Sequence, residues 1–234
     1  MADDLVTLGL DALQARIGHF FRDKSLLEQA VTHPSGAIEA GKPRLLSYER
    51  LEFLGDSILN AWVAELLFDG FSQENEGVLA RLRSYWVSGP VLARFAAQLK
   101  LDAHLVMGVG EERDGGRTKE RILAASFEAL VAALYLDAGV RFTRKFVREL
   151  WKDHVKRRGL QVLDEDAKTK LQEMMQAAGK PLPTYVTESS PEGFKATVFL
   201  NRRASGHGAG SNKKAAEQAA ARDALLSITP AETK

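Results

Sequence analysis

A fifteen-residue run of small and apolar side chains, residues 122–136 (ILAASFEALVAALYL), constrains the fold more than any other feature of this chain. A helix that is apolar on all sides is stable only when it is buried, so we expect the other helices of its domain to pack around it. The polar interruptions of the run are Ser126 and Glu128. An unpaired buried carboxylate is costly, and Glu128 therefore needs a cation, a proton or a salt bridge to an arginine.

A second helical stretch, residues 49–59 (ERLEFLGDSIL), carries carboxylates at a spacing of i, i+3 and i+7. At about 100° per residue, Glu49, Glu52 and Asp56 fall within roughly 60° of one another. The opposite side gathers the apolar residues that we expect to face the core: Leu51, Leu54, Ile58 and Trp62. Carboxylates on one side of a largely apolar helix repel one another, so the pattern predicts a metal site, or else a solvated acidic face.

Helical periodicity dominates the chain as far as residue 157, and a different pattern follows. The expected helices lie at 26–32, 47–68, 77–86, 89–99, 119–137 and 141–156, which indicates an all-α domain over residues 1–157. Residues 158–165 are charged, include Gly159 and are expected to form a linker. The α+β domain expected over 166–230 has the order αβββα: a helix at 167–178, strands near 184–188, 194–200 and 203–207, and an Ala-rich helix at 213–227.

The composition narrows the chemistry that the chain can perform. No cysteine is present, which excludes disulfides, thiolate zinc sites and cysteine nucleophiles, so a metal must bind to oxygen or histidine ligands. The five histidines show neither HExxH spacing nor a local grouping with serine and aspartate, so zinc hydrolysis and acyl transfer lack support. No uncharged apolar run reaches membrane-spanning length, and the N-terminal MADDLVTLGL is acidic rather than signal-like. A cytoplasmic location without a membrane partner is expected.

Several motifs of the first domain resemble those of bacterial ribonuclease III. They are ERLEFLGDSIL at 49–59, His33, Glu76-Gly77, Arg81 to Arg83, GGRTK at 115–119 and FEAL at 127–130. The resemblance covers nearly the whole chain, and the motifs follow the family's order. It implies a magnesium-dependent endoribonuclease, with manganese as a substitute, that cleaves double-stranded RNA as a homodimer and leaves 5′-phosphate and 3′-hydroxyl ends. It also implies a role in processing rRNA, mRNA and other structured RNA precursors.

The resemblance implies that Glu52, Asp56 and Glu128 bind the metal and that Asp56 and Glu128 are catalytic, since hard cations prefer oxygen ligands. One departure affects this site. The family has an aspartate three residues before the second-helix glutamate, where this chain has Ala125. Alanine cannot ligate a metal, whether it is native or engineered at this position. Either the three carboxylates and water suffice for cleavage, or the chain is a cleavage-impaired dimer that binds duplex RNA.

Four further residues of the first domain receive two interpretations each. Glu49 and Glu76 are expected as outer members of the acidic site, or else as a helix-end charge pair and a turn carboxylate. Phe53 and Leu54 resemble the apolar positions by which the family dimerises, although such side chains are also common in a plain core. The sequence alone leaves these alternatives open.

The second domain resembles the double-stranded RNA-binding domain. The matching motifs are Lys168-Thr169-x-Leu171-Gln172-Glu173, Pro183-Thr184-Tyr185, Gly206-x-Gly208-x-Gly210 and Asn212-Lys213-Lys214-x-Ala216-Glu217-Gln218-Ala219-Ala220. Residues 166–228 hold 9 Lys and Arg against 6 Asp and Glu, whereas residues 1–165 hold 22 against 24. This basic excess is modest, so the motif carries more weight than the charge. The loop at 189–193 (SSPEG) is shorter than the family's and lacks its histidine, which predicts a smaller footprint or a lower affinity.

Specific RNA contacts follow from this resemblance. Asn212 can cap the last helix, which leaves Lys213 and Lys214 at the positive end of the helix dipole, where phosphates bind. Thr169 and Gln172 share a face of the domain's first helix and resemble the family's minor-groove contacts, which read shape and 2′-hydroxyls more than sequence. We therefore expect two helices of this domain to bind duplex RNA.

Overall fold

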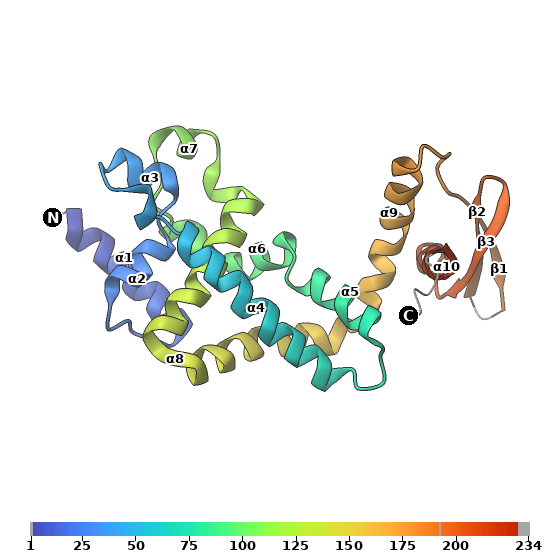
Figure 1. Cartoon of the computed structure of the whole chain (residues 1–234), viewed down its shortest axis with the longest axis horizontal. Coiled ribbons are helices and arrows are strands. Elements are labelled where there is room, and N and C mark those ends of the chain that lie inside the picture. The colour runs from blue at the N-terminus through green and yellow to red at the C-terminus, as the bar shows by residue number, and fades with distance from the viewer. Residues whose placement is uncertain (1, 192, 229–234) are drawn as a thin grey trace, which may run out of the picture. The chain divides into compact units, whose positions relative to one another are not determined.

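The computed structural model describes residues 2–191 and 193–228, except for the side chains of residues 2–9 and 164–166. The chain divides into two compact units, Met1–Arg157 and Arg158–Lys234 (Figure 1). The first unit is helical, and the second contains a three-stranded antiparallel sheet with helices. The expected fold class, an all-α domain followed by an αβββα domain, is confirmed.

The first unit contains helices that the sequence pattern predicted and others that it did not. Its α-helices are α1 (Ala2–Ile17), α2 (Lys24–Ala30), α3 (Pro34–Glu39), α4 (Glu49–Gly70), α5 (Glu76–Trp86), α6 (Gly89–Gln98), α7 (Val109–Arg113) and α8 (Glu120–Arg158). Short 3₁₀ turns lie at Arg44–Leu46, Leu101–His104 and Gly116–Thr118. No helix was expected at α1, α3 or α7. In α3 the N-cap is His33, whose Nδ1 accepts a hydrogen bond from the Ser35 amide at 3.1 Å, and histidine is not among the usual capping residues.

The helix α8 is the buried centre of the first unit, as its apolar sequence predicts. Every residue from Ile122 to Leu134 is buried except Glu128, which is partly exposed. By length and composition α8 could cross a membrane, but 72% of its apolar window is buried inside the protein, as in the core helix of a globular domain. The helices expected at 119–137 and 141–156 both lie in α8, which is kinked at Gly139, where φ is 80°. A left-handed conformation of this kind favours glycine.

The helix α4 presents a different face to the core from the one expected. Its buried row follows an i+4 spacing: Leu51, Gly55, Leu59, Val63 and Leu67. Leu54, Ile58 and Trp62, which were expected to face the core, are only partly buried. The buried face is rotated because Gly55, which has no side chain, lies against the backbone of α8.

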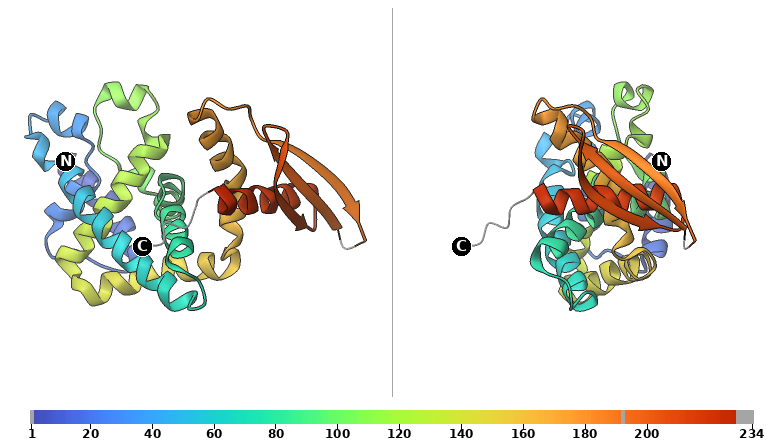
Figure 2. Two further views of the ribbon diagram at one scale, coloured as in Figure 1. Left: turned by 45° about the vertical axis from the view of Figure 1, so that its right-hand side comes forward. Right: turned by 90° about the vertical axis from the view of Figure 1, so that its right-hand side faces the viewer.

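The second unit has the element order that its sequence predicts. It consists of α9 (Gln161–Ala177), β1 (Thr184–Ser190), β2 (Gly193–Leu200), β3 (Arg203–Gly210) and α10 (Lys213–Ile228). The strands pair in the order β1-β2-β3, and α10 packs along one face of the sheet (Figure 2). The segment 158–165, expected as a linker, is mostly helical because α9 already begins at Gln161, and Gln, Leu, Asp and Glu are tolerated in helices. Residues 229–230, placed in this domain from the sequence, lie outside the described residues.

Glycines allow β3 to lie directly on α10. A Cβ at Gly206 would lie 2.4 Å from the carbonyl oxygen of Ala220, and a Cβ at Gly208 would lie 2.2 Å from the amide nitrogen of the same residue. The Gly-x-Gly-x-Gly motif therefore permits close contact between the strand and the Ala-rich helix. Ser190 pairs with Gly193 across the β1–β2 hairpin, so the loop expected at 189–193 is mostly strand. Glu192 of that loop lies outside the described residues.

Candidate active site

The two acidic segments meet where α4 crosses α8 (Figure 1). A Cβ at Gly55 would lie 1.9 Å from the carbonyl oxygen of Glu128, a separation that no real side chain could adopt. Glycine is therefore required at this crossing. Because Asp56 follows Gly55 directly and Glu52 precedes it by one turn, both carboxylates are carried to the part of α8 that holds Glu128.

The carboxylates at the crossing repel one another. Burial, Asp56 and Glu52 raise the pKa of Glu128 to about 8. Burial, Glu49 and Asp56 also raise the pKa of Glu52, while the nearby charge of Arg121 acts in the opposite direction. Among the side chains that the structure describes, no basic group pairs with Glu128, so the arginine salt bridge considered from the sequence is absent there. At neutral pH the Glu128 carboxyl retains a proton unless positive charge arrives.

The donor set suits a hard divalent cation. Glu52, Asp56 and Glu128 offer oxygen ligands, and a cation among them would relieve the repulsion that raises the pKa of Glu128. Within the described residues, no three Asp, Glu or His side chains are already gathered closely enough to hold a metal ion. These carboxylates would have to close around the ion. Ala125, which is 6% exposed and lies one turn before Glu128 on α8, contributes no ligand.

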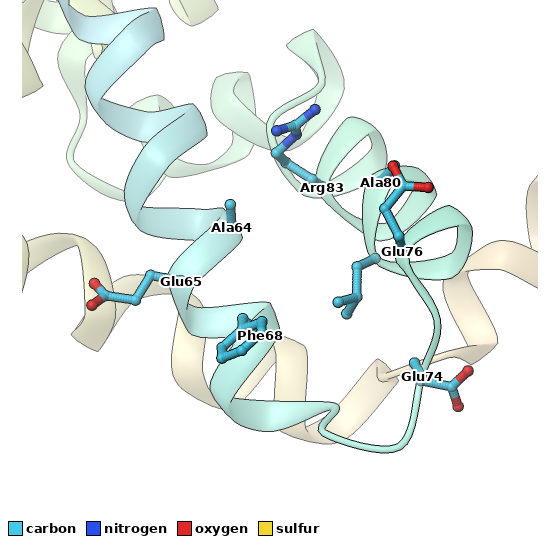
Figure 3. Close-up of a pocket in the computed structure, with 8 residues that line it drawn as sticks. Ala64, Glu65, Phe68, Glu74, Glu76, Ala80 and Arg83 are labelled. Atoms are coloured by element: carbon cyan, nitrogen blue, oxygen red, sulfur yellow. The ribbon is translucent and has the colours of Figure 1, made fainter. Parts of the chain in front are cut away.

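Glu49 and Glu76, expected as outer members of the acidic site, have other surroundings than Glu52, Asp56 and Glu128. The Glu49 carboxylate accepts hydrogen bonds from Arg44 Nε at 2.7 Å and Nη2 at 2.5 Å, and this partner lowers the pKa of Glu49. The helix-end charge pair considered for Glu49 is therefore present. Glu76 is the first residue of α5, after the N-cap Asn75, and it lines a pocket between α4 and α5 (Figure 3).

The helix α4 lines that pocket and also carries an exposed phenylalanine, Phe53. The pocket has a volume of about 670 Å³ and is lined by Ala64, Glu65, Phe68, Glu74, Glu76, Leu79, Ala80 and Arg83. Figure 3 shows Phe68 from α4 facing the side chains of α5 across it. Phe53 on α4 is 79% exposed, whereas Leu54 is partly buried. Phe53 is therefore not a core residue of this chain.

His33 and Tyr48 support the start of α4. Burial lowers the pKa of His33, whose ring packs edge-on against the Tyr48 ring at a centroid distance of 5.7 Å. The Tyr48 amide donates a hydrogen bond to the carbonyl of Thr32 at 2.9 Å. Since Tyr48 directly precedes Glu49, these contacts fix the entry of the acidic helix. The sequence motif included His33 but did not indicate that it acts as a helix cap.

The charged neighbour Arg121 was not identified from the sequence. It lies on α8 two turns before Glu128. Its charge opposes the rise that burial causes in the pKa of Glu52 and Tyr48, and it adds to the lowering of the pKa of His33 by burial. The spacing of i and i+7 on a buried helix would have placed Arg121 on the face of Glu128. That signal was available in the sequence.

The residues expected to contact RNA are exposed in the second unit. Thr169 and Gln172 are exposed on α9, and Lys213 and Lys214 are exposed in the first turn of α10. The expected cap is present, because Asn212 Oδ1 accepts a hydrogen bond from the Ala215 amide at 2.9 Å.

Lys168 connects the two helices that carry these residues. Its Nζ lies 2.6 Å from Glu217 Oε2 on α10 and 4.4 Å from the centre of the Tyr185 ring. Its backbone amide donates a hydrogen bond to Gln218 Oε1 at 2.9 Å. Lys168 adjoins Thr169, and Glu217 lies one turn after Lys213. The spacing between the two exposed sets of residues that are expected to contact RNA is therefore held by buried or partly buried polar contacts.

Comparisons with known proteins agree with this two-part organisation. Residues 23–154 match the family described as Ribonuclease-III-like, and residues 167–228 match the double-stranded RNA binding motif. Ribonuclease 3 of Nitrosococcus oceani is 40% identical over 228 residues, which cover 94% of this chain and 95% of that protein. Ribonuclease 3 of Caldanaerobacter subterraneus subsp. tengcongensis is 41% identical over 224 residues, which cover 94% and 98% of the two chains.

A solved structure is similar to the first unit. The nuclease domain of ribonuclease III from Campylobacter jejuni is 35% identical, with a TM-score of 0.57, and the match covers 62% of this chain and 96% of that chain. A helical unit with an acidic crossing, followed by a unit that matches an RNA-binding motif, defines an RNA-directed nuclease as the class of protein. The chain belongs to the ribonuclease III family of endoribonucleases, whose members are generally metal-dependent.

Proposed function

We propose that this protein cleaves double-stranded RNA by divalent-metal-assisted hydrolysis where α4 crosses α8. The observation that carries the proposal is the backbone contact of Gly55 with Glu128, together with the pKa of Glu128, which burial, Asp56 and Glu52 raise to about 8. In the reaction, water adds to phosphorus and the bond from phosphorus to the 3′-oxygen breaks. The products carry 5′-phosphate and 3′-hydroxyl ends. Bound Mg²⁺, or Mn²⁺ in its place, would activate the water and balance charge on the phosphate.

In this scheme the protein's own carboxylates would bind the divalent cation and fix its position. Glu52 and Asp56 offer oxygen ligands from α4, and Glu128 offers them from α8. The proton on the Glu128 carboxyl is released when positive charge replaces it, which couples binding to pH. Asp56 and Glu128 are the proposed catalytic residues, and the Glu49 carboxylate stays paired with Arg44 at the edge of the site.

The second unit would hold the duplex. Exposed Lys213 and Lys214 bind phosphates at the start of α10, while Thr169 and Gln172 contact the minor groove from α9. We propose processing of rRNA, mRNA and other structured RNA precursors as the biological role and the cytoplasm as its location. Membership of the ribonuclease III family supports the ribonuclease activity that this role requires.

The proposed assembly is a homodimer formed through α4. Ala64 and Phe68, which line the pocket, follow Phe53 by 11 and 15 residues, so at about 100° per residue they lie within roughly 60° of its direction. Phe53 and Ala64 are about 16 Å apart along the helix. A twofold contact repeats the same surface on both subunits, so each exposed Phe53 can enter the pocket of the other copy. Two equivalent acidic sites would then match the two strands of a duplex.

Sedimentation at micromolar concentration tests the homodimer. The unaltered chain should be dimeric, and Phe53→Ala should weaken association by about 30-fold or more, since an aromatic anchor at an interface contributes on the order of 2 kcal/mol. Phe20→Ala is the matched control, because Phe20 is also a largely exposed phenylalanine of the first unit, at 63% exposure. A monomeric chain, with and without RNA, would contradict the proposal.

Ala125 favours a second candidate function, a duplex-RNA-binding dimer with impaired cleavage. Incubation of perfect duplex RNA with Mg²⁺ or Mn²⁺, followed by gel analysis of product ends, separates the two. We expect cleavage, with manganese favoured, because one missing carboxylate weakens the rigid geometry that magnesium demands. Ala125→Asp should raise the magnesium-supported rate, and Glu128→Gln should abolish cleavage. Duplex binding with no cutting in either metal would establish the binding protein instead.

A further inference from the structure

Arg121 shares the face of α8 that forms the acidic site. Arg121, Ala125 and Glu128 are spaced i, i+4 and i+7, so at about 100° per residue they fall within roughly 60° of one another. Glu128 is set at the crossing by the backbone contact with Gly55. Ala125, the residue of this row between Arg121 and Glu128, is 6% exposed and carries no polar group.

The charge of Arg121 acts on several elements around the site. It opposes the rise in pKa that burial causes for Glu52 and Tyr48 at the start of α4. It also adds a smaller contribution to the lowered pKa of His33, after burial, and of Glu111 on α7, after Lys119. Its position on the Glu128 face of α8 and its effect on Glu52 together place the Arg121 charge beside the α4 side of the acidic crossing.

Arg121 is also uncommitted, in contrast to the basic residues just before it. Arg117 Nε lies 2.6 Å from Glu112 Oε1, and Lys119 Nζ lies 2.6 Å from Glu111 Oε1. Arg121 is exposed, and no hydrogen bond or ion pair joins it to another described residue. An exposed, unpaired guanidinium beside a carboxylate cluster is suited to an anion that must approach that cluster.

We propose that Arg121 contacts the scissile phosphodiester of duplex RNA and that this role depends on alanine at position 125. The proposal rests on the proposed function. A guanidinium binds phosphate oxygens through paired N–H donors, which offsets the repulsion between the phosphate and the carboxylates. Besides adding a metal ligand, an aspartate at 125 would lie at i+4 from Arg121, where an ion pair would withdraw the guanidinium from RNA. The magnesium-supported gain expected for Ala125→Asp therefore comes from metal binding alone. The present residue keeps Arg121 available.

A four-member set tests this coupling: the unaltered chain, Arg121→Gln, Ala125→Asp and the double variant. Single-turnover cleavage of duplex RNA is measured with saturating Mn²⁺, together with the RNA concentration for half-maximal rate. In the unaltered background, Arg121→Gln should lower the maximal rate about 10²-fold, as expected for a lost transition-state donor, with little change in the half-maximal concentration. In the Ala125→Asp background the same change should cost less than about threefold.

Three controls separate this role from a structural one. Arg121→Lys keeps the charge but not the paired donors, and it should recover about tenfold of the lost rate. Arg94→Gln, at an exposed arginine of α6 with no ion pair among the described residues, should leave the rate unchanged. The thermal unfolding midpoint should be the same for the unaltered chain and Arg121→Gln.

The results that would contradict the role of Arg121 differ from those that would contradict the proposed nuclease function. An equal loss in both backgrounds, a change in half-maximal concentration alone, or a loss matched by Arg94→Gln would overturn the role of Arg121 while leaving the nuclease intact. An unaltered chain that cuts no duplex RNA in either metal would overturn the proposed function, and the Arg121 proposal with it.

Discussion

In each of the two units a glycine allows close backbone contact between two elements, but the charged residues near the two contacts have opposite signs. Gly55 lets α4 touch α8 at Glu128, and Gly208 lets β3 touch α10 at Ala220. At the first contact, partly buried carboxylates are pressed together and the pKa of Glu128 rises to about 8. Near the second, Lys213 and Lys214 remain exposed in the first turn of α10.

Because of this difference, the charged residues of the two units should affect stability and function differently. Like charges that share a partly buried site destabilise the fold in the absence of a cation, so the nuclease site is expected to gain activity at the expense of stability. Exposed lysines keep their hydration and attract phosphates at little cost. Substitutions should therefore affect both stability and activity in the first unit, but mainly binding on the helix surface of the second.

Gly55→Ala should give the largest combined effect on stability and cleavage. The added Cβ would lie 1.9 Å from the Glu128 carbonyl oxygen, so α4 and α8 must separate. We expect a loss of about 1–3 kcal/mol or more in unfolding free energy and at least a 10²-fold loss of cleavage, because displaced catalytic groups lose their geometry. Gly70→Ala on the same helix, where nothing lies within 4 Å of the added atom, should retain both. Equal behaviour of the two variants in unfolding and cleavage assays would contradict the proposed crossing.

Glu128→Gln should abolish cleavage but stabilise the metal-free protein at high pH. The glutamate titrates near 4.5 when unfolded, whereas burial, Asp56 and Glu52 raise its pKa to about 8 in the folded chain. Below pH 4.5 both states hold the proton. Between pH 4.5 and 8 the unfolded state loses it first, so stability falls by up to about 1.4 kcal/mol per pH unit, less where solvent screens the group.

Urea unfolding without divalent metal at pH 5.5 and 8 measures this effect. The advantage of Glu128→Gln over the unaltered chain should be larger at pH 8. Glu49→Gln is a control of opposite sign, because Arg44 lowers the pKa of Glu49 and the carboxylate therefore stabilises the fold above its titration range. A pH-independent difference for Glu128→Gln would show that its proton is not held as described.

Lys213→Ala/Lys214→Ala should give the smallest change in catalysis. Two phosphate contacts are removed, so duplex affinity should fall and the slope of log affinity against log salt should flatten by about two. Cleavage at saturating RNA should change little. Lys195→Ala is the matched control, since Lys195 is exposed on β2 and alternates with buried Ala196, which faces α10. An unchanged salt slope in the double variant would mean that the second unit binds RNA by another surface.

The sequence predicted the parts of this structure that depend on local pattern. The buried run at 122–136, the element order of the second unit and the cap at Asn212 all follow from periodicity or from residue type. The spacing of Glu52 and Asp56 also predicted that both carboxylates lie on one face of a helix.

The remainder depends on contacts between distant segments. The core face of α4 is set by Gly55 against α8, which no pattern within α4 shows. The exposure of Phe53 and the position of Arg121 beside the acidic crossing likewise require both helices to be in place. The helix α3 was missed because its cap is a histidine.

Calorimetric titration with Mn²⁺ at pH 7 tests the acidic crossing most directly. Repeating it in buffers of different ionisation enthalpy gives the number of protons released. We expect saturable binding with release approaching one proton per chain, since most Glu128 carboxyls hold a proton at this pH. In Glu128→Gln binding should weaken and the proton release should disappear. Binding with the same affinity and proton release in Glu128→Gln, or no binding by the unaltered chain, would contradict a metal site built from Glu52, Asp56 and Glu128.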